Sequence, residues 1–153
     1  MKTTLTLLTV ATVGLGTTAI SASAEETLPN IVTIASRTPI ERNRIGSAIS
    51  IVDRDLLEQR QSVTVADILQ DLPGLAISRA GGPGQQTQLR IRGAEANHVL
   101  VVIDGVRVND PAIGDEFSFE QLTSWDVDNI EVVRGPQSAL WGSDAMAGVI
   151  NIT

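Results

Sequence analysis

The stretch NIEVVRGPQSALWGSDAMAGVINIT, residues 129–153, decides the fold that we expect for this chain. Its β-branched run at residues 130–133 predicts a strand. Pro136 should end that strand, because proline cannot donate a ladder hydrogen bond, and it suits the first turn of a short helix. Gly142 suits the end of this helix, and residues 148–152 predict a second strand. The spacing therefore predicts two strands joined by a tight helical crossover.

The chain before this stretch alternates between short strand patterns and short helix patterns. Residues 99–103 form an unbroken apolar run, which predicts a strand buried on both faces. Thr64 and Asp67 form a capping-box-like pair at the start of one helix, and Asp53 can cap another. Further strands are expected over residues 48–52, 75–78 and 88–92. We therefore expect an α/β (α+β) fold, a small mixed sheet with short helices and long loops.

Residues 1–24 have the features of a secretory signal peptide. Lys2 gives a minimal positive start, residues 5–20 form an apolar but threonine-rich run, and Ala22 and Ala24 are the small residues that a signal peptidase needs. An uncleaved membrane anchor is the alternative, and the short apolar core disfavours it. We expect cleavage after Ala24, with an N-terminal segment and linker over residues 25–44 and one modest domain over residues 45–153.

The composition excludes several classes of function. The formal net charge is −7, and every acidic residue follows the expected cleavage site. A nucleic-acid-binding protein is therefore not expected, because such proteins need a basic face. The absence of cysteine excludes disulfides and thiolate metal sites, and His98 has no second histidine with which to form a metal site. No G-x-S-x-G nucleophile motif is present, so we expect neither an enzyme nor a resident cofactor.

Three segments carry a resemblance to a known family. Residues 129–153 fit a strand of the type V-E-x-[IV]-x-G-P followed by S-A-[LY]-[YW]-G-S-x-A-x-x-G-V-I-N-[IV]. The matching residues are Glu131, Gly135, Pro136, Ser138, Ala139, Trp141, Gly142, Ser143, Ala145, Gly148, Val149, Ile150 and Asn151. Residues 67–74 and 91–109 fit the same family. Together the segments resemble the plug domain of TonB-dependent outer-membrane receptors, and residues 91–109 resemble its cobalamin-receptor branch.

The resemblance implies a receptor that imports a scarce nutrient across the outer membrane of a Gram-negative bacterium. In that family the plug is seated inside a β-barrel of about 22 strands. A barrel needs many alternating strands and girdles of aromatic residues, whereas this chain has no Tyr, two Trp and two Phe. We therefore expect this polypeptide to be the plug part of a longer receptor, or a truncated product, and not itself the transmembrane pore.

The segment after the expected cleavage site resembles the TonB box of this family. Its residues are Ile31, Val32, Thr33, Ile34 and Ala35. A short extended segment with β-branched residues can add as a strand to the sheet edge of a partner, here the energy transducer TonB. To be reached, the segment should stay undocked or weakly docked. A frayed N-terminal strand or a plain linker is the alternative.

Two loops are expected to contact the substrate. The first loop is glycine-rich, and its expected contact residues are Gly82, Pro83, Gly84, Gln85 and Gln86. The second loop is acidic, and its expected contact residues are Ile113, Gly114 and Asp115. Glycine lets the backbone approach a bound molecule closely. A plain hairpin connection and an exposed acidic loop are the alternatives. The resemblance favours cobalamin as the substrate, with an iron chelate, as in siderophore receptors, as the alternative.

Arg92 and Arg134 each precede a glycine at the end of an expected strand. One interpretation is that both are solvated charges. The resemblance implies instead that they meet acidic residues of the barrel wall and latch the plug there. Two other classes of function stay open, a free-standing periplasmic binding or adaptor module without a barrel and, less favoured, an exported enzyme.

Overall fold

The computed structural model describes residues 31–32, 34, 40–41 and 46–153. The expected signal peptide, residues 1–24, lies outside the described residues. So do most of residues 25–44, including Thr33 and Ala35 of the expected TonB box. Within the described part of the chain, no helix has both the length and the apolar character needed to cross a membrane.

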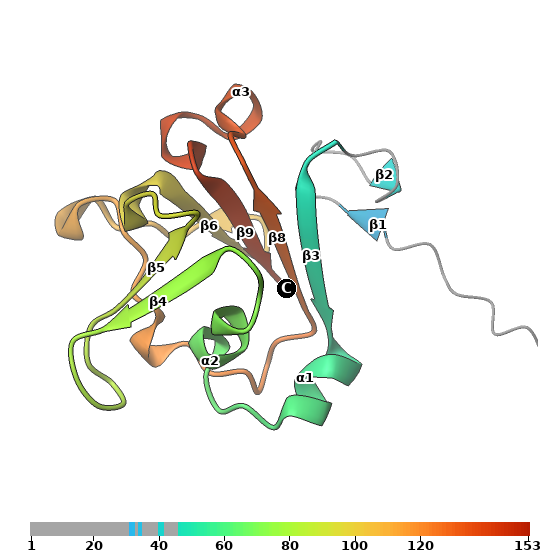
Figure 1. Ribbon diagram of the computed structural model, residues 1–153, viewed down its shortest axis with the longest axis vertical. Coiled ribbons are helices and arrows are strands. Elements are labelled where there is room, and N and C mark those ends of the chain that lie inside the picture. Colours follow the sequence, from blue (N-terminus) through green and yellow to red (C-terminus); the bar gives the residue numbers. More distant parts are fainter. Residues whose placement is uncertain (1–30, 33, 35–39, 42–45) are drawn as a thin grey trace, which may run out of the picture.

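A five-stranded mixed sheet forms the centre of the fold (Figure 1). Its strands, in spatial order, are β3 (Ala48–Asp53), β8 (Asn129–Arg134), β9 (Gly148–Ile152), β6 (Val99–Ile103) and β7 (Val106–Arg107). Neighbouring strands are antiparallel except β6 and β9, which are parallel. The predicted mixed sheet with short helices is confirmed.

The connection between β8 and β9 differs from the predicted helical crossover. The two strands are antiparallel neighbours, with Val133 opposite Val149, and the parallel partner of β9 is β6. The helix between them, α3 (Ser138–Trp141), has four residues and leads into the 3-10 turn η5 (Ser143–Ala145). A helix of this length spans about 6 Å and a five-residue strand about 17 Å. The helix can therefore reverse the chain at one end of the sheet but cannot cross a face.

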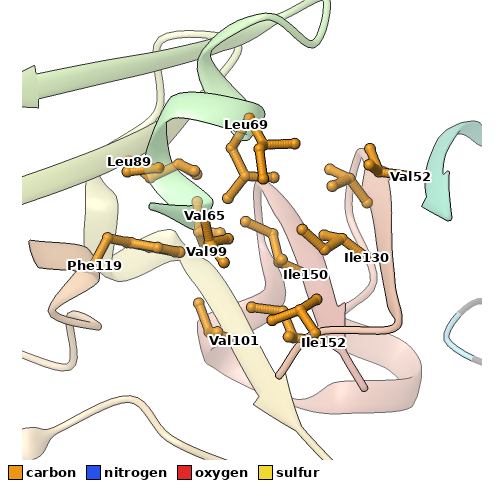
Figure 2. Packing of buried hydrophobic residues seen from close by; sticks show 14 of the residues in the cluster. Val52, Val65, Leu69, Leu89, Val99, Val101, Phe119, Ile130, Ile150 and Ile152 are labelled. Carbon is orange, nitrogen blue, oxygen red and sulfur yellow. The ribbon is translucent and has the colours of Figure 1, made fainter. Parts of the chain in front are cut away.

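One face of the sheet, which we call the first face, carries the main hydrophobic core. The elements that cover it are α1 (Arg54–Arg60), α2 (Val65–Gln70), the hairpin of β4 (Leu75–Arg79) and β5 (Thr87–Ile91), and the 3-10 turn η4 (Phe119–Gln121). Figure 2 shows Val65 and Leu69 of α2 packed over Ile150 of β9. Leu89 of β5 lies beside them, so the hairpin and the helix share one core with the sheet (Figure 2).

The two helices of this layer begin at the predicted capping residues. The Asp53 carboxylate accepts a hydrogen bond from the Leu56 N–H at 3.0 Å, which caps α1. The Thr64 hydroxyl accepts one from the Asp67 N–H at 3.3 Å, which caps α2. Because α2 is only six residues long, burial of its apolar face and this cap must stabilise it together.

The opposite face, which we call the second face, is covered by less of the described chain. A two-stranded ladder of β1 (Ile31–Val32) and β2 (Ile40–Glu41) lies beside it (Figure 1). The buried residues of this face are Val32, Ile34, Ile49, Leu100, Val102, Val133, Ala145 and Val149. Along β6, residues 99 and 101 face the first core and residues 100 and 102 face this one, as the period of two requires. The prediction of a strand buried on both faces is confirmed.

Gly148 occupies the point where β9 passes β8 and β5 most closely. A Cβ atom at this position would overlap the carbonyl oxygen of Val133 and would lie 2.8 Å from Cδ1 of Ile91. Both neighbours are buried, so neither can move away without disturbing a core. Only glycine fits here without displacing the strand.

Candidate functional site

The first expected contact loop, residues 80–86, is the tip of the β4–β5 hairpin (Figure 1). The Ala80 N–H donates to the Gln86 carbonyl at 3.0 Å and closes the loop, and the Gln85 N–H donates to the Gly82 carbonyl at 3.1 Å. The five expected contact residues, 82–86, are all exposed. The loop therefore presents its backbone to solvent, and contact with a substrate stays a prediction.

The second expected contact loop, residues 111–117, is held to the sheet by Asn109. The Asn109 side-chain oxygen accepts from the Val101 N–H at 2.8 Å, and its amide nitrogen donates to the carbonyls of Val99 at 3.0 Å and Asp115 at 2.7 Å. The loop includes the 3-10 turn η3 (Pro111–Ile113), and residues 113–115 are exposed. Substrate contact again stays a prediction. Our sequence analysis missed Asn109, because its position after a strand does not indicate which backbone groups it meets.

Two hydrogen bonds tie the hairpin to the second loop and to the 3-10 turn η4 that follows it. The Gln88 amide donates to the Glu116 carboxylate at 2.8 Å, and the Thr87 N–H donates to the Glu120 carboxylate at 3.3 Å. Both donors lie on β5, and the acceptors flank Phe119, which is buried. The two expected contact loops are thus anchored to a common support.

A pocket of about 210 Å³ lies beside the hairpin loop and has charges of both signs in its wall. Its lining residues are Thr64, Ala66, Asp67, Arg79, Gly81, Gly82, Pro83, Gly84, Thr87, Phe119 and Glu120. Residues 82–84 of the first loop therefore line it. Residues 85–86 and 113–115 are not part of its wall, so the structure does not gather all the expected contact residues in one cavity.

Asp67 is the most strongly held ionisable group of this pocket. The Thr64 hydroxyl donates to its carboxylate at 2.7 Å, and the Arg79 guanidinium pairs with it at 2.6 Å. These two hydrogen bonds lower the pKa of Asp67 below its ordinary value, because they stabilise the charged form more than its partial burial disfavours it. The pocket wall therefore keeps a fixed negative charge next to a fixed positive one.

Arg92 and Arg134 come together at one end of the sheet. A Cβ atom at Gly74 would lie 3.8 Å from Cγ of Arg92 and 3.7 Å from Cδ of Arg134, so both side chains pass the same glycine. Arg134 donates to the carbonyl of Pro73. Arg92 is exposed, and its backbone is left-handed with φ of 53°. Its side chain forms no ion pair with another described residue. The predicted latch residues are neighbours, and their pairing with a barrel wall stays a prediction.

The expected TonB-box segment is docked on the second face where the structure describes it. The side chains of Val32 and Ile34 are 0% and 2% exposed. The Ile34 N–H donates to the Glu131 carboxylate at 3.3 Å, and the Trp141 indole N–H donates to the Ile34 carbonyl at 2.8 Å. We expected this segment to be undocked or weakly docked, and the described residues are docked on the apolar second face. Binding of this segment to TonB stays a prediction.

Glu131 and Trp141 are functional candidates that our sequence analysis did not single out for this contact. A signal for Glu131 was present, since it is a lone carboxylate within the apolar run of β8 and is only 2% exposed. Buried carboxylates are retained only where hydrogen bonds satisfy them. Trp141 gave no such signal, because an indole N–H can meet any carbonyl within its reach.

Among the described residues, no three side chains of His, Cys, Asp or Glu lie close enough together to hold a metal ion. The hydrogen bonds and charges described above serve to hold loops and segments in place. The arrangement therefore offers a scaffold with exposed loops, two adjacent arginines and a docked N-terminal segment.

The sequence and the structure were compared with known proteins. The family model described as TonB-dependent Receptor Plug Domain matches residues 41–149. The siderophore receptor PirA from Acinetobacter baumannii is 26% identical with a TM-score of 0.55, over 68% of this chain and 16% of that chain. The ferripyoverdine receptor of the outer membrane of Pseudomonas aeruginosa is 19% identical with a TM-score of 0.68, over 81% of this chain and 16% of that chain.

The alcaligin outer-membrane receptor FauA from Bordetella pertussis is 18% identical with a TM-score of 0.64, over 80% of this chain and 20% of that chain. At the identities of the last two receptors the likeness concerns the fold alone. The chain thus spans about a sixth to a fifth of the length of the solved receptors that it matches, at 16% to 20%.

Proposed function

The chain belongs to the TonB-dependent receptor plug domain family, and from this premise we propose that it is the gating and ligand-contact part of an outer-membrane receptor for active nutrient uptake. The observation that carries the proposal is the family match over residues 41–149, which includes most of the central sheet, both expected contact loops and the two arginines. The matched family is one of transport receptor domains and not of enzymes. The proposed partners are the receptor β-barrel, TonB and a small-molecule ligand.

The proposed ligand is a ferric siderophore. Three solved receptors that this chain resembles carry the words siderophore, ferripyoverdine and alcaligin in their descriptions. Cobalamin, which the motif at residues 91–109 favoured, has no support among these neighbours. The siderophore alternative is therefore the better supported of the two, and cobalamin serves as the competing ligand in the tests below.

The proposed mechanism has three steps, each assigned to residues of this chain. The ligand binds from outside on loops 81–86 and 111–117, which share the support described above. Arg92 and Arg134 hold the plug through guanidinium–carboxylate pairs with the barrel wall, in a wet environment where such pairs can break and reform. TonB then captures residues 31–35 as an added strand and pulls, so that the plug is remodelled and a passage opens.

Replacing Ile34 by proline tests the assignment of the TonB box. Proline removes the backbone N–H that strand addition needs, so energised uptake of the ligand should fall to the background of a TonB-deficient strain. Surface binding at low temperature should stay at the wild-type level. Ile34→Val keeps the N–H and is the matched control, with near-normal uptake. Normal uptake by Ile34→Pro would contradict the assignment.

Deleting residues 82–86 tests the ligand-contact loop. The deletion removes the exposed hairpin tip but keeps β4 and β5, so the affinity of intact cells for ferric siderophores should fall about tenfold if the loop contributes one good contact. Binding is measured with a panel of labelled ferric siderophores and with labelled cobalamin. Unchanged affinity for every ligand would place the binding site outside this loop.

A further inference from the structure

The pocket beside the hairpin loop has the size of one side group of a ligand. Its volume is about 210 Å³, whereas pockets that enclose a whole drug-sized molecule have about 300–1,000 Å³. Three of the four loop residues in its wall are Gly81, Gly82 and Gly84, so the exposed loop contributes mainly backbone there. A ligand that rests on this loop can therefore reach the pocket with one arm, while its bulk stays outside.

Glu120 brings a carboxylate with a free oxygen into the wall of this pocket. Its Oε2 accepts from the Thr87 N–H at 3.3 Å, and no described residue donates to its Oε1. No described arginine forms an ion pair with Glu120, although the residue is partly buried. A carboxylate that is partly withdrawn from water gains most from a cationic partner that also donates hydrogen bonds. The free oxygen is therefore suited to such a group.

The positive charge in the pocket wall is already engaged. The Arg79 guanidinium pairs with the Asp67 carboxylate at 2.6 Å, and Asp67 also accepts from the Thr64 hydroxyl at 2.7 Å. Because these contacts lower the pKa of Asp67, this pair stays charged at neutral pH. The wall thus holds two carboxylates, at residues 67 and 120, against one guanidinium. The uncompensated charge is negative, and it is that of Glu120.

The two segments that flank the pocket add charge of the same sign. Residues 80–88 and 108–120 contain no Lys or Arg, and Asp110, Asp115 and Glu116 lie in the second of these segments. The Glu116 carboxylate accepts from the Gln88 amide at 2.8 Å, so it is held on the same strand as the partner of Glu120. Like charges repel one another. This surface therefore disfavours a ligand that turns negative charge towards it.

We propose that the pocket binds a primary ammonium group carried by the ligand, with the Glu120 carboxylate as its counter-ion. An ammonium group has three N–H donors. One meets Oε1 of Glu120, and another meets the hydroxyl oxygen of Thr87, which lines the pocket and donates its own hydrogen to the Gln85 carbonyl at 2.9 Å. The ligand class is then a chelate with a free amine arm, in preference to an anionic chelate without one. This inference rests on the proposed function for the identity of the ligand as a ferric chelate.

Protection of a thiol in the pocket wall tests the ammonium site without any chelate. The chain has no cysteine, and Gly82→Cys places one in the wall, where a Cβ atom meets nothing within 4 Å. The complete receptor is used in outer-membrane vesicles, and any cysteine elsewhere in it is replaced. n-Butylammonium chloride should slow labelling of this thiol about twofold at the concentration that fills half of the pockets. 1-Butanol and sodium chloride at the same concentration should not slow it.

Glu120→Gln removes the charge of this side chain and keeps an oxygen for the Thr87 N–H, so the hairpin stays tied. In this variant n-butylammonium should no longer slow the labelling. Glu95→Gln is the matched control, because Glu95 is exposed, makes no side-chain hydrogen bond at its helix cap and is not part of the pocket wall. It should keep the protection. Equal protection in both variants, or no protection in the receptor that retains Glu120, would overturn the ammonium site.

A pair of ferric chelates separates the ammonium site from the proposed function. One is a linear ferric trihydroxamate that ends in a primary ammonium group, and the other is the same chelate with that amine acetylated. The receptor should bind the ammonium form about tenfold more tightly, and Glu120→Gln should abolish this preference by weakening the binding of that form alone. Equal affinity of the receptor for both forms would overturn the proposal that the pocket takes a ligand arm. Binding of no ferric chelate, together with protection by n-butylammonium, would overturn the proposed function and would support the ammonium site.

Discussion

The two faces of the central sheet are covered by different kinds of chain. The first face is covered by α1, α2, the β4–β5 hairpin and η4, which follow one another between β3 and β8 and share one hydrophobic core. The described cover of the second face consists mainly of Val32 and Ile34, held by two side-chain hydrogen bonds, and of Ala145. The first cover consists of elements that follow one another within the domain, whereas much of the described second cover comes from the N-terminal segment.

The difference shows how one sheet can carry two separate hydrophobic clusters, one on each face. Leu100, Val102 and Val149 on the second face belong to strands that are also packed on the first face through their neighbours. Removing the segment exposes apolar surface at a cost of roughly 25 cal/mol for each Å². The core on the first face remains intact. The larger cluster therefore lies on the first face, and the cluster that includes Val32 and Ile34 lies on the second face of the same strands.

The largest expected effect comes from truncating the first-face core at the central strand. Ile150→Ala should lower the free energy of unfolding by about 2–5 kcal/mol, because Ile150 is fully buried and its neighbours from α2 and β8 cannot close the cavity. Urea unfolding of the chain measures the change. Val149→Ala, the adjacent residue on the second face, should cost less, and an equal cost would break the comparison between the faces.

Gly148 gives the next largest effect. Gly148→Ala should destabilise the chain by about 1–3 kcal/mol, because the new methyl group meets the Val133 carbonyl and the Ile91 side chain. Gly82→Ala is the matched control, since a Cβ atom there meets nothing within 4 Å and the backbone has no positive φ. Equal urea midpoints for Gly148→Ala and the unchanged chain would show that β8 and β9 have more room than the structure indicates.

The smallest expected effect concerns the cap of α2 at the edge of the first face. The pKa of Asp67 is lowered by its hydrogen bonds to Thr64 and Arg79, so the carboxylate stabilises the folded state at pH values above its unfolded pKa of about 3.9. This stabilisation is lost as the pH falls through the lower folded pKa. Asp67→Asn should therefore show a weaker loss of stability on acidification than the unchanged chain.

Urea midpoints at pH 6 and pH 3 measure this difference. Asp126→Asn is the control, because Asp126 is exposed and no described residue forms a hydrogen bond or ion pair with it. Parallel acid profiles for Asp67→Asn and the unchanged chain would mean that the Thr64 and Arg79 contacts do not hold the carboxylate in solution.

Local elements of the fold were predictable because their causes are local. The run at residues 99–103, the caps at Asp53 and Thr64 and the strand at residues 148–152 are each determined by neighbouring residues. The antiparallel pairing of β8 with β9 was not predictable in this way. Sheet order depends on contacts between distant segments, and the crossover that we expected has the same local pattern as the turn that is present.

The candidate site was predictable to a smaller extent. Arg92 and Arg134 could be named from their positions before glycines, but their meeting beside Gly74 depends on how β5 packs over the sheet. The contacts of Glu131 and Trp141 depend on backbone groups far away in sequence. Asn109 contacts backbone groups 6 to 10 residues away, which its residue type alone does not indicate. The assignments of TonB-binding and ligand-contact residues stay predictions.

The place of β9 in the sheet has a consequence for the order of folding. β9 lies between β8 and β6, although it follows every other described strand along the chain. Contacts between strands so far apart in sequence require loop closure before they contribute stability, which slows folding. A chain delivered N-terminus first cannot complete this sheet until residues 148–152 arrive. Until then β8 and β6 lack the strand that lies between them.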